Sequence, residues 1–348
     1  MLLQPLRILR AALACASLAA LAAHGAAPSA APAPAPSPDV PAHYRQIIEA
    51  TGAVVGVKVR AIANARSADT LGAERTGSGV VFAPQGLILT VGYLILEADD
   101  VQVSTAQGRN VPASVVAYDH ATGFGLLKPL GPLDVKPIAL GSSAKVDVLD
   151  RLLVASGAGE DNLSVATVVA KRAFAGYWEY LLDEAIFTSP PRADFGGAAL
   201  INTEGQLVGI GSLFVMDAAT PGERLPGNMF LPIDLLKPVL SEMIATGRQH
   251  GGRRPWLGVS SIEQDGRLKV LRVSTDGPAE KAGLEPGDII LGLDGTKVHT
   301  LPDFYRKLWA AGKPGTEVTL EVLKGTEVRE FKVRSIDRID MIRRRPTI

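Results

Sequence analysis

The stretch Arg192–Leu200, which reads RADFGGAAL, has the residue types of a turn that would present a reactive side chain. A polar loop is followed by two adjacent glycines and a small apolar strand start, which is the arrangement that a nucleophile turn needs. None of Asp194, Phe195 and Gly196 can attack a carbonyl as a serine would. The pattern therefore predicts the backbone of a catalytic turn without its nucleophile.

Short β-type runs separated by Gly, Pro, Asn or Asp extend from Tyr44 to about Leu213 and surround this turn. Many short strands at a spacing of about 8–12 residues predict an antiparallel barrel or a pair of sandwiched sheets. Apolar spacing then predicts one helix in PIDLLKPVLSEMIATGR, with Asp234 as its N-cap, Pro238 in its first turn and Gly247 as its C-terminal stop.

A second domain is expected from Pro255 to about Ile336, with strands around one clear helix. Thr300 should cap that helix, and Asp303 stands three residues later, as in a capping box. Leu301, Phe304 and Leu308 share one face of the predicted helix, which indicates a buried side.

This second segment resembles a PDZ domain, on the strings WLGV (Trp256–Val259) and GPAEKAGLEPGDIILGLDGTKV (Gly277–Val298). In such a domain a glycine loop turns its N–H groups inward and holds a peptide's terminal carboxylate, while the peptide adds as a strand. The resemblance implies a peptide-binding site formed by Trp256, Leu257, Gly258, Val259, Ser260, Phe304 and Leu308. Plain core packing would explain the last two residues equally well. Arg253 and Arg254 could attract an anionic terminus or form a solvated basic linker.

The order of the two segments is similar to that of HtrA-type envelope serine proteases, which implies a mainly β fold with a chymotrypsin-like double β-barrel followed by a PDZ domain. The strings GAVVGVKV, GSGVVFAPQGLILTVGYLI and GQLVGIG carry the barrel resemblance. The family's catalytic His falls at Tyr93, its Asp at Gly123, and its Ser at Gly196 or Phe195, depending on the register. The resemblance therefore implies a degenerate triad with no catalytic residue, because all three members are replaced.

The resemblance implies an exported, catalytically inactive HtrA-like protein that binds protein C-termini or unfolded polypeptides, as a chaperone or adaptor in envelope quality control. It also implies a homotrimer formed through the start of the barrel domain, near Tyr44–Ile48, or association with active relatives. The alternative is a serine endopeptidase with residual activity or a displaced triad drawn from Ser156, Ser189 and His120. A structural envelope protein with fixed partners is a third interpretation.

The first 25 residues read as an export signal, with Arg7 and Arg10 before the apolar stretch Ala11–Ala23. That stretch is shorter than the roughly 20 residues of a spanning helix, so cleavage into the periplasm is expected; a retained segment would tether the protein to the membrane. Cys15, the single cysteine, lies inside this segment, and its removal would exclude disulfides and thiol catalysis. The expected organisation is a signal peptide over 1–25, an Ala/Pro-rich linker over 26–43, a trypsin-like domain over 44–249, a PDZ domain over 250–336 and a basic tail over 337–348.

The composition bears on which classes of partner the protein can bind. The chain has 36 basic and 36 acidic residues, and the lack of a basic surplus argues against a nucleic-acid binder. The closing run Arg343–Arg345 is too short to change this and is expected to be a solvated tail. The histidines show no metal-ligand spacing, so neither a metal nor another cofactor is expected, and no membrane span is expected after signal cleavage.

Overall fold

The computed structural model describes residues 42–157, 162–247 and 253–343, all of which belong to the compact unit Pro41–Ile348. The predicted signal peptide and nearly all of the linker lie outside the described residues. No helix in the described ranges has the length and apolar character needed to cross a membrane.

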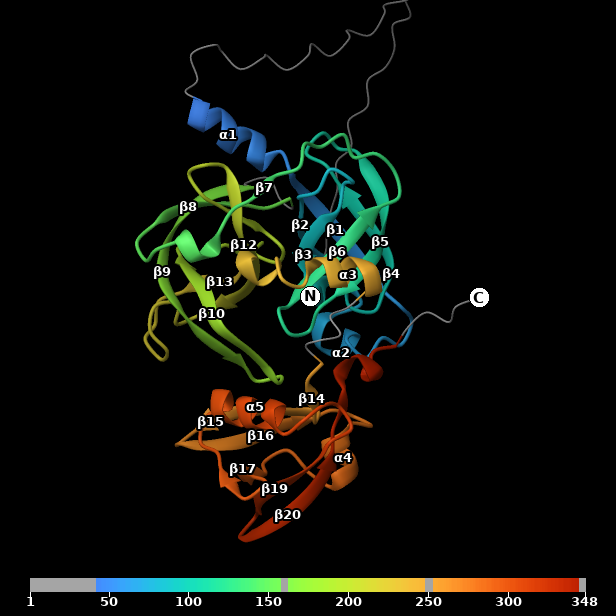
Figure 1. Ribbon diagram of the computed structural model, residues 1–348, viewed down its shortest axis with the longest axis vertical. Helices are drawn as coiled ribbons and strands as arrows, with labels where there is room; N and C mark the ends of the chain where they lie inside the picture. Colours follow the sequence, from blue (N-terminus) through green and yellow to red (C-terminus); the bar gives the residue numbers. More distant parts are fainter. Residues whose placement is uncertain (1–41, 158–161, 248–252, 344–348) are drawn as a thin grey trace, which may run out of the picture. The chain divides into compact units, whose positions relative to one another are not determined.

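The first barrel is closed and its strands neighbour one another in the order β1-β2-β3-β6-β5-β4 (Figure 1). Aliphatic side chains fill its interior, where Val57, Val80 and Leu126 are fully buried. These strands are Val54–Ala61 (β1), Glu74–Val81 (β2), Ile88–Val91 (β3), Ala98–Ser104 (β4), Asn110–Tyr118 (β5) and Phe124–Pro129 (β6).

A helix, α1 (Ala42–Thr51), precedes β1, so the prediction of β-type runs from Tyr44 onward is wrong for this stretch. The sequence AHYRQIIEAT is rich in good helix formers and has no run of β-branched residues longer than its two isoleucines, which favours the helix. A one-turn helix, α2 (Ala68–Leu71), lies between β1 and β2.

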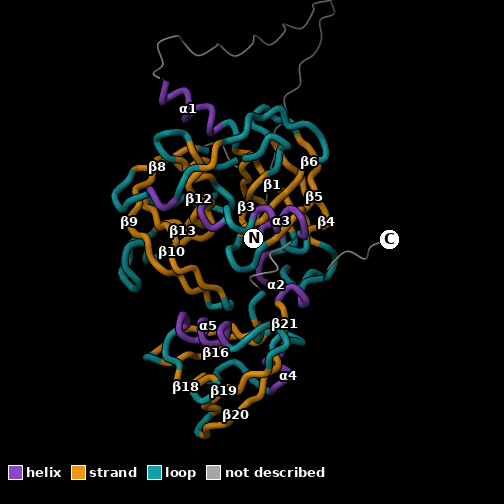
Figure 2. The backbone as a smooth tube through the Cα atoms, in the orientation of Figure 1, coloured by secondary structure: helices purple, strands orange, loops and turns teal. Residues whose placement is uncertain are grey.

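The second barrel is a sheet in the order β11-β8-β9-β10-β13-β12-β7, in which β11 also pairs with β12 and closes the ring. Together the two barrels confirm the predicted double barrel, and strands dominate both (Figure 2). β9 and β10 pair up to Gly176 and Tyr180, so Tyr177–Glu179 forms the tip of a long hairpin. These strands are Ala139–Leu140 (β7), Arg151–Ala155 (β8), Leu163–Gly176 (β9), Tyr180–Ser189 (β10), Ala199–Ile201 (β11), Gln206–Val215 (β12) and Gly227–Pro232 (β13).

The helix predicted after β13 is broken into a 3-10 turn, η3 (Ile233–Leu235), and a short helix, α3 (Leu240–Thr246). The prediction of Asp234 as N-cap is wrong, because its carboxylate accepts a hydrogen bond from Ala144 N at 2.9 Å and further bonds from two serine hydroxyls of the same turn. Gly247 ends α3 in the left-handed conformation, at φ 75°, as predicted.

The second domain has a sheet in the order β15-β16-β17-β19-β20, with β18 beside β17, and a separate β14–β21 pair. Its main helix is α5 (Leu301–Ala310), where Thr300 Oγ1 accepts from Asp303 N at 3.3 Å and confirms the predicted cap. A shorter helix, α4 (Pro278–Ala282), follows β16. The strands are Pro255–Trp256 (β14), Val259–Gln264 (β15), Arg267–Val273 (β16), Ile289–Leu293 (β17), Thr296–Lys297 (β18), Glu317–Lys324 (β19), Glu327–Arg334 (β20) and Ile336–Asp337 (β21).

The described start of the predicted basic tail is ordered by backbone pairing and hydrogen bonds. After β21 the chain forms a 3-10 turn, η4 (Arg338–Met341). Arg343 donates from its backbone N to Glu97 Oε1 and from Nη1 to Asn64 O, each at 2.8 Å. Arg343 is hydrogen-bonded but exposed, so the expectation of a solvated tail holds for it, and the two arginines that follow lie outside the described residues.

Candidate functional site

The glycine turn before β11 brings Gly196 close to Tyr93. A Cβ at position 196 would lie 3.1 Å from the Tyr93 hydroxyl, with nothing else closer. Gly197 has φ +77° and a Cβ there would collide with Ser78 O, so this position requires glycine. The side-chain direction at position 196 thus points at residue 93, as a nucleophile points at its base, but glycine supplies no reactive atom.

The positions that the family resemblance assigns to the base and its orienting acid are filled by other contacts. Tyr93 Oη donates to Ser212 O at 2.8 Å, and burial raises the pKa of Tyr93, which leaves the phenol protonated. Gly123 has φ +86°, and a Cβ there would lie 2.8 Å from Tyr180 Oη. That hydroxyl donates to Thr122 O at 2.8 Å. Neither the phenol of Tyr93 nor that of Tyr180 can take a proton from a nucleophile at neutral pH.

Asp194 places a carboxylate in the turn. Arg192 donates to it from Nε at 2.8 Å and from Nη2 at 2.7 Å, and the Ser156 hydroxyl donates to the same carboxylate. Although burial opposes ionisation, the hydrogen bonds from Arg192 and Ser156 lower the pKa of Asp194. A carboxylate that stays ionised beside the turn opposes the negative charge that develops on an oxyanion.

The side chains considered for a displaced triad do not meet. Ser189 Oγ donates to Pro226 O at 2.9 Å, and Ser156 is bonded to the carboxylate described above. His120 packs edge-on against Tyr118, with ring centroids 4.2 Å apart and its ring nitrogens shielded from solvent, and this desolvation together with a nearby arginine lowers its pKa well below the usual value. Within the part of the chain that the structure describes, no hydrogen bond joins His120 to either serine.

In the PDZ-like segment, the loop predicted to hold a carboxylate does hold one, and it comes from the same chain. Gly258 N donates to Glu179 Oε1 at 2.7 Å, Val259 N to Oε1 at 2.8 Å, and Leu257 N to Oε2 at 3.0 Å. Gly258 has φ +82°, and a Cβ there would lie 3.0 Å from the Trp256 ring, so the loop needs glycine at this point.

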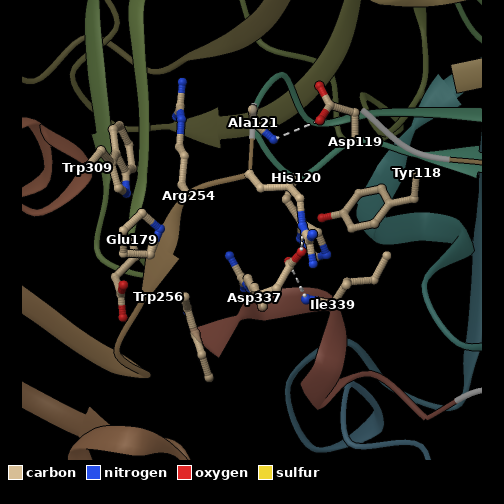
Figure 3. Close-up of a pocket in the computed structure, with 13 residues that line it drawn as sticks. Tyr118, Asp119, His120, Ala121, Glu179, Arg254, Trp256, Trp309, Asp337 and Ile339 are labelled. Atoms are coloured by element: carbon tan, nitrogen blue, oxygen red, sulfur yellow. Dashed lines mark hydrogen bonds and ion pairs between the residues drawn. The ribbon is translucent and has the colours of Figure 1, made fainter. Parts of the chain in front are cut away.

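Glu179 lies at the tip of the β9–β10 hairpin and is only 7% exposed. Burial outweighs the hydrogen bonds from the loop and raises the pKa of Glu179 to about 7. It lines a pocket together with His120, Arg254 and Trp309 (Figure 3). Arg254 stacks over the Trp309 ring, 3.9 Å from its centroid. Arg253 forms an ion pair at 2.7 Å with Asp337, which is also part of the pocket wall.

The remaining predicted peptide-binding residues lie around this loop. Phe304 and Leu308 of α5 are fully buried in one apolar cluster with Leu257 and Val259, and Leu181 of β10 belongs to the same cluster. The last two predicted peptide-binding residues lie in paired strands, where Trp256 pairs with Ile336 and Ser260 pairs with Arg272.

Comparison with known proteins agrees with both halves of the fold. A family model described as a trypsin-like peptidase domain matches residues 77–210, and one described as a PDZ domain matches residues 255–334. The serine endoprotease DegS of Haemophilus influenzae is 30% identical over 298 residues, which cover 82% of this chain and 84% of that protein. The chain belongs to the HtrA-type family of serine proteases.

Three further similar proteins have lower sequence identity to this chain. A probable periplasmic DegP-like serine endoprotease of Pseudomonas fulva is 27% identical over 279 residues, and the chain spans only 56% of its length. A solved serine endoprotease from Yersinia pestis has a TM-score of 0.51 at 24% identity, covering 86% of this chain and 99% of that one. The HtrA-type protease AlgW solved with a decapeptide has a TM-score of 0.51 at 21% identity, covering 87% and 99%. At these identities the two structures support the fold alone.

The site residue that sequence reasoning missed in this HtrA-type chain is Glu179. The string GYWEY around it is a hairpin tip with an acidic residue between aromatic ones, and nothing local marks that carboxylate as a ligand. Its partners are the three N–H groups of Leu257–Val259, which any sequence supplies.

Proposed function

We propose that this chain is a catalytically inactive member of the HtrA family that binds peptides through its PDZ domain. The observation that carries the proposal is the pairing at the turn, where Gly196 takes the position that points at Tyr93. A covalent acyl-transfer mechanism needs a nucleophile, a base and a group that orients the base, and the side chains here supply none of them.

The bound partners in this proposal are protein C-termini or unfolded polypeptides. Three convergent N–H groups in the Leu257–Val259 loop suit a carboxylate, and the buried residues Phe304 and Leu308 suit an apolar terminal side chain. The relative AlgW was solved with a decapeptide, which agrees with peptide recognition in this family.

The proposed place of action is the periplasm, in envelope quality control. The basic start and apolar stretch of the first 25 residues suit export, and the DegP-like relative is named as periplasmic. We further propose that copies of the chain, or the chain and an active relative, associate through α1, where Ile48 is 60% exposed.

The test is to incubate the purified protein with casein beside an active relative and to measure, in parallel, the binding of a library of C-terminal peptides. We expect no cleavage above background and binding that requires a free terminal carboxylate. Cleavage that survives removal of contaminating proteases and is lost in Ser189→Ala, Ser156→Ala or His120→Ala would instead establish a displaced triad. Binding that ignores the terminal carboxylate would favour a structural protein with fixed partners.

A further inference from the structure

We propose that the tip of the β9–β10 hairpin, Tyr177–Glu179, is a built-in ligand of the PDZ carboxylate loop, and that an external C-terminal peptide binds only by displacing it. This inference rests on the proposed peptide-binding function and names how the same site is regulated.

The first support is that one loop cannot hold two carboxylates. Leu257, Gly258 and Val259 each have one backbone N–H, and all three point at Glu179, with the shortest distances from Gly258 and Val259, at 2.7 and 2.8 Å. A peptide terminus needs the same three donors. Occupation by Glu179 and by an external carboxylate is therefore mutually exclusive.

The second support is the backbone contact that accompanies the carboxylate. Ser261 N on β15 donates to Tyr177 O at 2.9 Å. β15 pairs with β16 along its other edge, so Tyr177 uses the edge that strand addition would use. The hairpin tip is a turn, with Glu179 at φ 56°, so it meets β15 through one backbone carbonyl and places the Glu179 carboxylate, two residues later, where a chain terminus would lie.

The third support is that apolar and polar contacts around the tip fill the rest of the groove. Leu181 belongs to the apolar cluster that contains Phe304 and Leu308. Tyr305 Oη on α5 donates to Gly176 O at 2.8 Å and accepts from Glu179 N at 3.2 Å. A peptide that ends in leucine is the probe that best matches what the hairpin places there.

The buried centre, not the exposed rim, holds the hairpin to the PDZ domain. The ion pair between Arg306 and Asp183 has side chains 56% and 83% exposed, and exposed pairs contribute little to stability. Glu179, by contrast, is shielded from water and accepts from three backbone N–H groups, and buried hydrogen bonds of this kind are costly to lose. Removing this one carboxylate should free the groove.

The expected effect on binding follows from the fraction of molecules whose groove is open. The apparent dissociation constant equals the intrinsic one divided by that fraction, so a hairpin that occupies the groove in most molecules weakens peptide binding by the same factor. A groove open in about one molecule in ten or fewer would bind peptide about 10-fold or more weakly than an open groove.

The experiment uses a fluorescein-labelled decapeptide with a C-terminal leucine, and the same peptide amidated at its terminus, in polarisation titrations of the full chain. Glu179→Ala is expected to bind the acid peptide about 10-fold or more tightly than the unchanged protein. Glu184→Ala is the matched control, because this glutamate is on the same hairpin but pairs with Lys171 at 3.2 Å and is 55% exposed. The control should bind like the unchanged protein, and the amidated peptide should bind to none of them.

Tyr305→Phe provides a second variant that keeps the PDZ core, since it removes only the hydroxyl that contacts the hairpin. It should also bind the acid peptide more tightly, which covers the case that Glu179→Ala fails to fold. Amide hydrogen exchange of Leu257–Val259 gives a readout without peptide, and exchange should accelerate about 10-fold or more in Glu179→Ala.

The two proposals fail in different ways. Equal peptide affinity in the unchanged protein, Glu179→Ala and Tyr305→Phe, with unchanged exchange at Leu257–Val259, would overturn the built-in ligand and leave peptide binding intact. Faster exchange in Glu179→Ala, with no peptide bound by any variant, would support the built-in ligand and overturn the proposed function.

Discussion

Replacing Gly196 by serine is expected to leave the protein folded but inactive. The new Cβ would meet only the Tyr93 hydroxyl within 4 Å, at 3.1 Å, and Gly196 does not have a positive φ that a serine would resist. The hydroxyl of Tyr93 is fixed by Ser212 O at 2.8 Å, so a small displacement is needed. Mild overpacking of this kind costs about 1 kcal/mol, which a domain of this size tolerates.

The serine would still lack a base. Burial raises the pKa of Tyr93, and the hydroxyl of Tyr180 occupies the space next to Gly123, 2.8 Å from where a Cβ would stand. Loss of triad members lowers kcat by about 10⁴- to 10⁶-fold in well-studied proteases. Adding Tyr93→His and Gly123→Asp would not rebuild the site, because position 123 has φ +86° and its side chain would collide with Tyr180.

The assay is the initial rate of labelled-casein cleavage by Gly196→Ser, compared with an active relative at equal concentration. The expected rate is at least about 10⁴-fold below that of the relative. The double variant Gly196→Ser/Tyr93→Phe serves as control and should behave identically, because the phenol is not acting as a base. A rate for Gly196→Ser within about 100-fold of the relative, or a rate that the control abolishes, would refute the reasoning.

Three stability measurements by urea unfolding test other contacts. Glu179 has a pKa of about 7 when docked, against an ordinary value of 4.5, so the protonated form docks best and its stabilisation should decline as the pH rises from 4.5 to 7. Measured relative to Glu179→Gln, the free energy of unfolding of the unchanged protein should fall by up to about 3 kcal/mol across this pH interval. A difference between the two proteins that does not change with pH would contradict the raised pKa of Glu179. Burial raises the pKa of the neighbouring Tyr305, so its hydroxyl stays protonated across this interval. Arg75→Met should lower the free energy of unfolding by about 3–5 kcal/mol, since this buried guanidinium bonds three backbone carbonyls and a serine hydroxyl, and a loss below about 1 kcal/mol would argue against that network. Thr300→Ala should cost about 1 kcal/mol through the lost cap, with Ala substitution of an exposed threonine as control.

Features that depend on a few neighbouring residues were predictable from the sequence. The cap at Thr300 and the left-handed end at Gly247 follow from side-chain and backbone rules that act within one turn. The barrel strands follow from short apolar runs between turn residues, which fix where a strand starts and stops. These rules explain why an antiparallel barrel or a pair of sandwiched sheets and the main PDZ helix were expected, whereas the double barrel was implied by the family resemblance.

Features decided by distant partners were not predictable. Asp234 looked like the cap of its own helix, but the N–H of Ala144, 90 residues earlier, competes for its carboxylate. Glu179 bonds Gly258, 79 residues later, through a backbone N–H that carries no sequence signature. Both cases follow from one physical rule, since a carboxylate that is shielded or partly shielded from water takes the best available donors wherever the fold supplies them.

The tyrosine hydroxyls at and beside the positions that match the triad have hydrogen-bond partners. The hydroxyl of Tyr93 is bonded to Ser212 O and that of Tyr180 to Thr122 O, each at 2.8 Å. The phenol of Tyr93 thus lies beside position 196 and that of Tyr180 beside position 123, and each finds a carbonyl acceptor for its hydroxyl. Because a histidine at position 93 or an aspartate at position 123 would disrupt one of these hydrogen bonds, packing opposes the introduction of a triad side chain by a single substitution.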